Sequence, residues 1–145
     1  GMGTDIMVQI GTWILQLLEA PEDTALQQSI HGQVRAVCAA YPINPEGTAG
    51  ECRILHDFHP NRGVDGMVFD TEGNIIATAG WEDGGPGPMI YVFDPDGQVL
   101  EMHPMPFKPS NCTFGDDDLR SLYVTAGGRL YRTRTERKGY LIYPS

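Results

Sequence analysis

The sequence predicts a mainly β protein: a partial β-propeller of about two and a half four-stranded blades, preceded by one or two N-terminal helices. Two observations support this prediction. Gly and Pro are abundant, with 18 and 11 of the 145 residues, which is typical of a chain with many turns. From Gln33 onward, short β-type segments recur about every ten residues, and similar stretches return after about 46 residues.

Residues 2–31 form the predicted helical segment. Pro21 ends the first helix, and a shorter helix is expected in the sequence TALQQSI that follows. The apolar face of the first helix has to be buried against another surface. Its residues recur with the i, i+3, i+4 spacing of a helix and are Ile6, Ile10, Trp13, Ile14, Leu17 and Leu18.

Residues 33–145 form the predicted β domain. The intervals between its strands are too short for crossover helices, so we expect antiparallel meanders. The predicted strands lie near 34–42, 52–58, 65–70, 74–79, 89–94, 98–103, 111–115, 121–125, 129–134 and 139–143.

An internal repeat divides this domain into blades. Residues 65–80 align with 111–128, and residues 89–100 align with 129–142. Repeats of about 40–50 residues that hold four strands are typical of propellers, which close with roughly 4–8 blades. We therefore expect the helical segment to cover an open blade face, or copies of the chain to complete one another as a homo-oligomer.

Charge and composition exclude several classes of protein. The net charge of −9 argues against a nucleic-acid or anionic-membrane surface. No apolar run approaches the ~18 residues of a membrane helix, and the first basic residue is Arg35, so we expect a cytoplasmic protein without a signal peptide. Three cysteines without CxxC spacing predict buried free thiols.

Two polar residues are the candidate metal ligands. The repeat places Asp65 and Asn111 at the entry of the innermost strand of two blades, facing the mouth of a central channel. Carboxylate and amide oxygens are ligands that hard cations such as Ca²⁺ and Mg²⁺ prefer. Alternatively, both side chains bind backbone amides of nearby loops, as in Asx turns.

The loop sequence GWEDGGPGP, residues 80–88, is predicted at the same end of the blades. Trp81, Glu82 and Asp83 in this loop are candidate substrate-binding residues. The loop could serve as a lid or a wall of the substrate site, or it could be an ordinary solvated connection.

Three longer stretches resemble a known family. RGVDGMVFDTEGNIIATAG, IYVFDPDGQVLEMHPMP and PSNCTFGDDDLRSLYVTAGGRLYR are similar to the C-terminal part of the senescence-marker/gluconolactonase/luciferin-regenerating enzyme-like family. The similarity covers roughly residues 40–143. It implies a six-bladed propeller that hydrolyses small-molecule lactones or esters with a divalent cation, usually Ca²⁺, with Mg²⁺ or Zn²⁺ as alternatives.

The resemblance also implies a role for one residue. Asp65 stands where the family has an Asp that binds the metal and acts as general base, whereas Asn111 matches none of the family's ligand positions. The family's other ligands, one Glu and two Asn, come from blades upstream of the matching part. We therefore expect a complete site only from assembled chains or a longer gene. The alternative is a non-catalytic, oligomerising module that binds a ligand or a partner.

Overall fold

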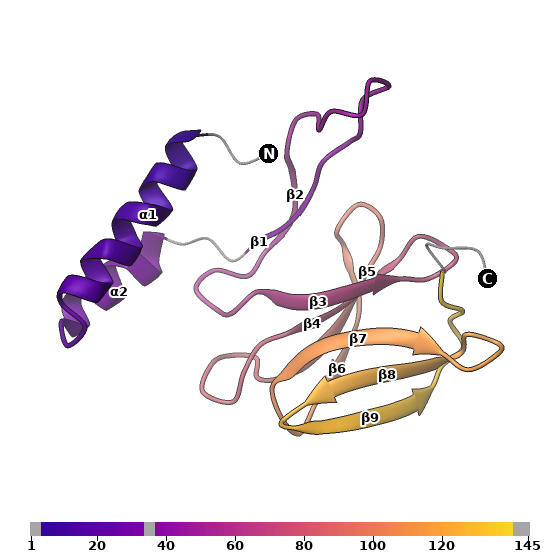
Figure 1. The fold of residues 1–145 in the computed structure, drawn as a ribbon. Helices are drawn as coiled ribbons and strands as arrows, with labels where there is room; N and C mark the ends of the chain where they lie inside the picture. Colours follow the sequence, from indigo (N-terminus) through magenta and orange to yellow (C-terminus); the bar gives the residue numbers. More distant parts are fainter. Residues whose placement is uncertain (1–3, 34–36, 141–145) are drawn as a thin grey trace. The chain divides into compact units, whose positions relative to one another are not determined.

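The computed structural model describes residues 4–33 and 37–140 (Figure 1). These residues belong to two compact units. One contains both helices and residues 41–51, and the other contains residues 37–40 and 52–140.

Two helices dominate the first unit, as the sequence predicts. Helix α1 spans Thr4–Glu19 and helix α2 spans Thr24–Gln33. The carboxylate of Asp23 caps α2, because its Oδ1 accepts a hydrogen bond from the Leu26 amide at 2.9 Å. Neither of these described helices has the length and apolarity that crossing a bilayer requires.

The apolar face of α1 is only partly covered. Ile10, Trp13 and Leu17 are half-buried. Ile14 and Leu18, however, remain 53% and 73% exposed. The helical prediction is thus confirmed, while these two side chains lack the burial that the sequence pattern demands.

Three antiparallel sheets make up the second unit, and each joins strands that are consecutive in the chain (Figure 1). The first has two strands, the second four and the third three, so the mainly β, blade-like prediction is confirmed. The strands are β1 (Val37–Ala40) and β2 (Arg53–Asp57); β3 (Val64–Phe69), β4 (Ile75–Ala79), β5 (Met89–Phe93) and β6 (Val99–Pro104); and β7 (Pro109–Gly115), β8 (Ser121–Ala126) and β9 (Arg129–Arg134).

The tenth predicted strand, 139–143, is not found among the described residues. Gly139 forms a single bridge with Asp70 instead, and the Tyr140 amide donates to the Phe69 carbonyl at 3.0 Å. The chain after β9 therefore returns to the end of β3 and does not pair with β9 over these residues. Residues 141–143 lie outside the described part of the chain.

The central strands of the four-stranded sheet, β4 and β5, are buried on both faces. Alternate side chains of β4 and β5 point into two different apolar clusters, as the two-residue period of a strand requires. One cluster contains Tyr91, Phe93 and Phe58, and the His56 ring lies 4.5 Å from the Phe58 ring. The other contains Ile76 and Val92 together with residues of β7 and β8. The second cluster fixes the two sheets face to face.

The repeated Asp–Gly turns are explained by backbone chemistry. Asp94 Oδ1 accepts hydrogen bonds from the Asp96 and Gln98 amides at 2.9 and 2.8 Å. Gly97 has a φ of +91°, and a Cβ there would lie 2.3 Å from the Leu55 carbonyl oxygen. Only glycine fits this backbone conformation and this close approach.

All three cysteines are free, but only two are buried. Cys38 and Cys112 lie in the interior, whereas Cys52 is exposed. The prediction of buried thiols is therefore wrong for Cys52, which lies immediately before β2.

Candidate functional site

Asp65 is the extra residue of a β-bulge. In the pairing of β3 with β4, Val64 is opposite Ala79 and Gly66 is opposite Thr78, which leaves Asp65 without a partner. The hydroxyl of Thr78 closes the bulge, accepting from the Gly66 amide at 3.0 Å and donating to the Gly66 carbonyl at 3.1 Å. Bulges re-aim a side chain relative to the regular strand, and they are common beside active sites.

The neighbouring sheet repeats this bulge. Pro109 is opposite Ala126 and Asn111 is opposite Thr125, so Ser110 is the extra residue of β7. The Ser110 hydroxyl lies 2.9 Å from that of Thr125. Ser110 is thus the counterpart of Asp65, and the predicted alignment of Asn111 with Asp65 is wrong by one residue.

The misalignment has a simple cause. The TAG sequences correctly align β4 with β8, 47 positions apart in the register of Thr78 and Thr125. From these paired residues onward, the hairpin of β7 and β8 contains one more residue pair than the hairpin of β3 and β4, before a turn of the same length. Equivalent residues of β3 and β7 are therefore 45 positions apart. Sequence matching carried the wrong offset back across that turn.

Asn111 nevertheless lies next to the Asp65 strand. A Cβ placed on Gly66 would lie 2.3 Å from Asn111 Oδ1, so the amide group rests directly on the Gly66 backbone. The same oxygen accepts a hydrogen bond from the Cys112 amide at 2.9 Å. The innermost strands β3 and β7 are therefore adjacent at this end, as in neighbouring propeller blades.

Arg62 is the residue that the sequence analysis missed. Its Nη2 pairs with Asp65 Oδ2, and its Nη1 donates to the Gly80 carbonyl at 3.3 Å. The two side chains are partly enclosed, 30% and 27% exposed. No motif marks this ion pair, because Arg62 lies on the connection before β3, where sequence spacing does not define direction.

The loop from Gly80 to Pro88 is closed at its base. Gly80 has a φ of +76°, and a Cβ there would lie 2.0 Å from the Gly87 carbonyl oxygen. Glu82 Oε1 accepts a hydrogen bond from the Lys108 amide at 2.7 Å, and this bond lowers the pKa of Glu82. Glu82 thereby holds the loop to the connection between β6 and β7.

The other two loop candidates are exposed to solvent. Trp81 is 41% exposed, and its indole nitrogen lies against Gly84, where a Cβ would approach to 2.4 Å. Asp83 is exposed on the same turn. These positions are compatible with contacts to a bound molecule, and they remain predictions.

The described residues do not by themselves fit a divalent-cation site. Among residues 4–33 and 37–140, no three His, Cys, Asp or Glu side chains could share a metal ion. The Asp65 carboxylate is paired with Arg62, and Asn111 Oδ1 already accepts a backbone hydrogen bond. Calcium requires six to eight oxygen ligands, so most would have to come from elsewhere.

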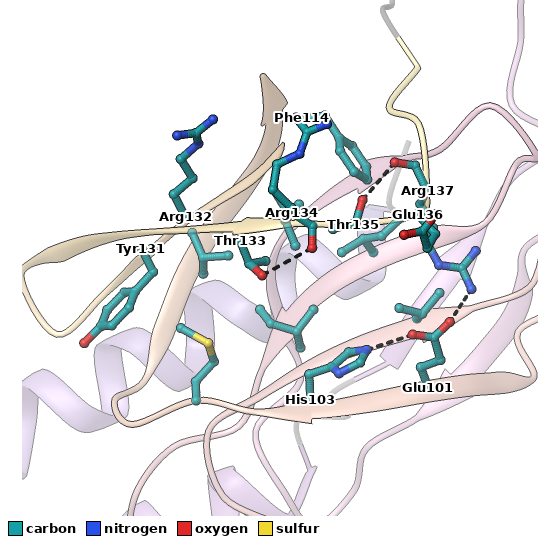
Figure 2. Close-up of a pocket in the computed structure, with 16 residues that line it drawn as sticks. Glu101, His103, Phe114, Tyr131, Arg132, Thr133, Arg134, Thr135, Glu136 and Arg137 are labelled. Atoms are coloured by element: carbon teal, nitrogen blue, oxygen red, sulfur yellow. Dashed lines mark hydrogen bonds and ion pairs between the residues drawn. The ribbon is translucent and has the colours of Figure 1, made fainter. Parts of the chain in front are cut away.

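A separate cavity of about 530 Å³ lies between the four-stranded and three-stranded sheets (Figure 2). Apolar side chains such as Ile76, Val92 and Val124 form one part of its lining, and polar or charged residues of β6, β9 and the segment after β9 form the other. Glu101 and His103 belong to this polar part, with His103 Nε2 2.8 Å from Glu101 Oε2. Asp65 does not line it, so the cavity is distinct from the end of the blades that carries Asp65.

Antiparallel sheets of consecutive strands, with the innermost strands β3 and β7 side by side, define the class of the β-propeller. Comparison with known families agrees, because residues 32–128 match the family described as the SMP-30/Gluconolactonase/LRE-like region. This match covers more than half of the chain. The chain belongs to that family.

This chain spans less than half of the length of each relative described here. The 6-deoxy-6-sulfogluconolactonase of Pseudomonas putida is 34% identical over 89 residues, which are 59% of this chain and 29% of the relative. The X-ray structure of a protein provisionally assigned as a gluconolactonase matches with a TM-score of 0.61 and 27% identity, over 72% of this chain and 33% of that one. Regucalcin from Agrobacterium tumefaciens, described as a calcium-binding protein, matches with a TM-score of 0.58 and 22% identity, over 72% and 40%.

Proposed function

We propose that this chain carries part of a lactone-hydrolysing site in which Asp65 acts as the general base. The observation that supports the proposal is the position of Asp65 on a bulge of an innermost strand, beside Arg62 and next to the adjoining blade. A carboxylate in that position can accept a proton from water while the water attacks a carbonyl carbon.

The proposed reaction balances with groups that this chain supplies. Water adds to the lactone carbonyl as its proton passes to Asp65, and the ring C–O bond then breaks. The proton returns from Asp65 to the departing alkoxide, which gives the open hydroxy acid. The positive charge of the Arg62 guanidinium, which lies against Asp65, stabilises the oxyanion that develops on the carbonyl oxygen.

The proposed substrate is an aldonolactone or a closely related ester. The support is the relation to the P. putida sulfogluconolactonase, of which this chain covers 29%. Hydroxyl groups suited to a polyhydroxylated substrate lie on the adjoining blade, where Ser110 and Thr125 form a pair 2.9 Å apart.

A divalent cation, Ca²⁺ before Mg²⁺ or Zn²⁺, belongs to this proposal as a cofactor of the complete site. Such an ion would supply Lewis-acid chemistry to the complete site. Asp65 is the one ligand that we assign to it in this chain, and the remaining oxygens would come from other blades or from other copies of the chain.

The proposal is tested by hydrolysis of glucono-1,5-lactone, followed at constant pH and corrected for the spontaneous reaction. We expect Asp65→Asn to lower kcat/KM by at least about 100-fold, because general-base catalysis contributes roughly 10²–10⁴-fold. Asp96→Asn is the control, since Asp96 is an exposed turn residue paired with Arg53. Equal rates for wild type and Asp65→Asn would contradict the proposal.

The second candidate function is a non-catalytic, self-associating module that binds a ligand, and the cavity between the two sheets favours it. We expect the neutral dye N-phenyl-1-naphthylamine to fluoresce in its apolar interior. Val124→Phe, which fills the cavity, should reduce that signal, whereas Asp65→Asn should not. Dye binding by a chain without lactonase activity would favour this candidate over the hydrolase.

A further inference from the structure

The Asp65 carboxylate is already paired with a cationic side chain, that of Arg62. Arg62 contacts Asp65 with one guanidinium nitrogen and the Gly80 carbonyl with the other, so both ends of its fork are used. Both side chains are about 70% covered, which weakens screening by solvent relative to an exposed pair. This arrangement connects the bulge of β3 to the base of the Gly80–Pro88 loop.

The guanidinium of Arg62 thus already places a positive charge beside Asp65, where a divalent cation would have to bind. A Ca²⁺ ion has to approach a carboxylate oxygen within about 2.3–2.6 Å. Oδ2 is in hydrogen-bond contact with Arg62, and an ion bound there would meet the positive guanidinium at close range. Repulsion between two such charges a few ångströms apart is large where solvent is partly excluded.

We infer that Arg62 is the resident counter-cation of Asp65, and that a divalent cation binds Asp65 only after Arg62 has been displaced. Arg62 is therefore a positioning residue that sets the cation preference of this site. The inference goes beyond the proposed function, because it concerns the affinity of Asp65 for cations and holds whether or not the chain hydrolyses lactones.

The chain offers a matched control for this ion pair. Arg53 donates to Asp96 Oδ1 at 2.9 Å and to the Pro95 carbonyl at 3.0 Å, so it also joins one carboxylate and one backbone oxygen. That pair is exposed, at 56% and 84%, and joins the start of β2 to the turn between β5 and β6, at the opposite end of the blade from Asp65. Arg53→Gln frees a carboxylate in the same way as Arg62→Gln, but away from the proposed site.

The experiment is a titration of the full chain with CaCl2 and with MgCl2, read as the melting temperature at constant ionic strength. Wild type and Asp65→Asn should respond alike, because Asp65 is not available in the wild type. The Ca²⁺ concentration that gives half of the shift in melting temperature should be at least about tenfold lower for Arg62→Gln than for the wild type. Arg62→Lys, which keeps the positive charge, should behave as the wild type does.

Two further variants make the result specific. The gain in Arg62→Gln should vanish in the double variant Arg62→Gln/Asp65→Asn, and Arg53→Gln should show no gain. A wild type whose Ca²⁺ response depends on Asp65 would overturn the inference, and that comparison holds even if Arg62→Gln fails to fold. An unchanged response in a folded Arg62→Gln would also overturn it. If the chain hydrolyses lactones but its Ca²⁺ response contradicts this inference, the proposed role of Asp65 in hydrolysis is unaffected.

Discussion

Asp70 connects two sheets through a single buried carboxylate. Only 3% exposed, it accepts hydrogen bonds from the Glu72 and Asn74 amides, from the Asn74 side chain at 2.8 Å and from Arg137 at 2.9 Å. Arg137 also pairs with Glu101 on β6. Arg137 therefore joins the turn after β3 and the strand β6 to the segment after β9.

Replacing this buried carboxylate should cost far more stability than replacing Asp94, the half-buried carboxylate of the turn after β5. We expect Asp70→Ala to lower the free energy of unfolding by about 3–5 kcal/mol, because Arg137 would lose a buried partner. Asp94→Ala removes a similar turn carboxylate without a buried ion pair and should cost only about 1 kcal/mol. Urea unfolding of the two variants checks the difference, and equal losses would contradict this role of Asp70.

Acid should weaken the fold through the depressed carboxylates. Burial raises the pKa of Asp70, but hydrogen bonds from Asn74 and Arg137 outweigh it, so its pKa is lowered. Hydrogen bonds from Ser121, then Tyr123 and Arg132, hold the pKa of Asp116 at about 2. Both groups have folded-state pKa values below the unfolded value of about 3.9, so their stabilisation is complete above that pH.

That stabilisation is lost as the pH falls through the folded-state values. We expect the melting temperature to fall between about pH 4 and pH 2, and the fall to be shallower in Asp116→Asn than in the wild type. A melting temperature that stays constant over this range in the wild type would contradict the assignment.

The thiols should differ sharply in reactivity. Burial raises the pKa of the Cys112 thiol to about 12, and burial also raises that of Cys38. Cys52 is exposed. Since the thiolate is the reactive form, an aromatic disulfide reagent should titrate one thiol in the native chain and three in urea. Loss of the native signal in Cys52→Ser identifies that thiol, and rapid native reaction of Cys112 would argue against its burial.

At the scale of elements, the alternation of β-type segments with Gly, Pro and Asp turns predicts nine strands correctly to within a few residues. The bulges could not be predicted, because an extra residue leaves the hydrophobic pattern nearly unchanged. The pairing of Arg62 with Asp65 depends on the direction of a connection, which no periodicity fixes. The bridge from Gly139 to Asp70 could not be predicted either, since it joins segments that are far apart in the sequence.

The bulge that presents Asp65 depends on one buried hydroxyl. Thr78 is fully buried and bonds both backbone groups of Gly66, whereas its counterpart Thr125 is exposed. Thr78→Val should therefore cost about 1–3 kcal/mol, because the Gly66 amide loses its partner. Thr125→Val should cost less than Thr78→Val when the two are compared by urea unfolding. Equal costs would mean that the hydroxyl does not stabilise the bulge.

At the scale of the molecule, the chain spans about 29% of its curated relative and 33–40% of the two matching structures. The described part supplies three blade-like sheets, of which only the second has all four strands. A polar site at the centre of a propeller draws its ligands from several blades. The family and the blade architecture of this chain are therefore established, whereas its activity as part of a complete propeller is a proposal.

Self-association remains a prediction, and the exposed residues of α1 provide its test. We expect the wild type to sediment above monomer mass at micromolar concentration, because Ile14 and Leu18 leave apolar surface uncovered. Leu18→Glu should shift the distribution toward the monomer, while Glu22→Lys on the following turn should not. A wild type that is monomeric under these conditions would contradict the prediction.

The proposed chemistry depends most on Asp65 as the active carboxylate of this gluconolactonase-family chain. The most direct measurement compares initial rates of glucono-1,5-lactone opening at constant pH for wild type, Asp65→Asn and Asp96→Asn. We expect catalysis above the spontaneous rate in the first and third proteins and its loss, by at least about 100-fold in kcat/KM, in the second. Catalysis that survives intact in Asp65→Asn would contradict this proposal.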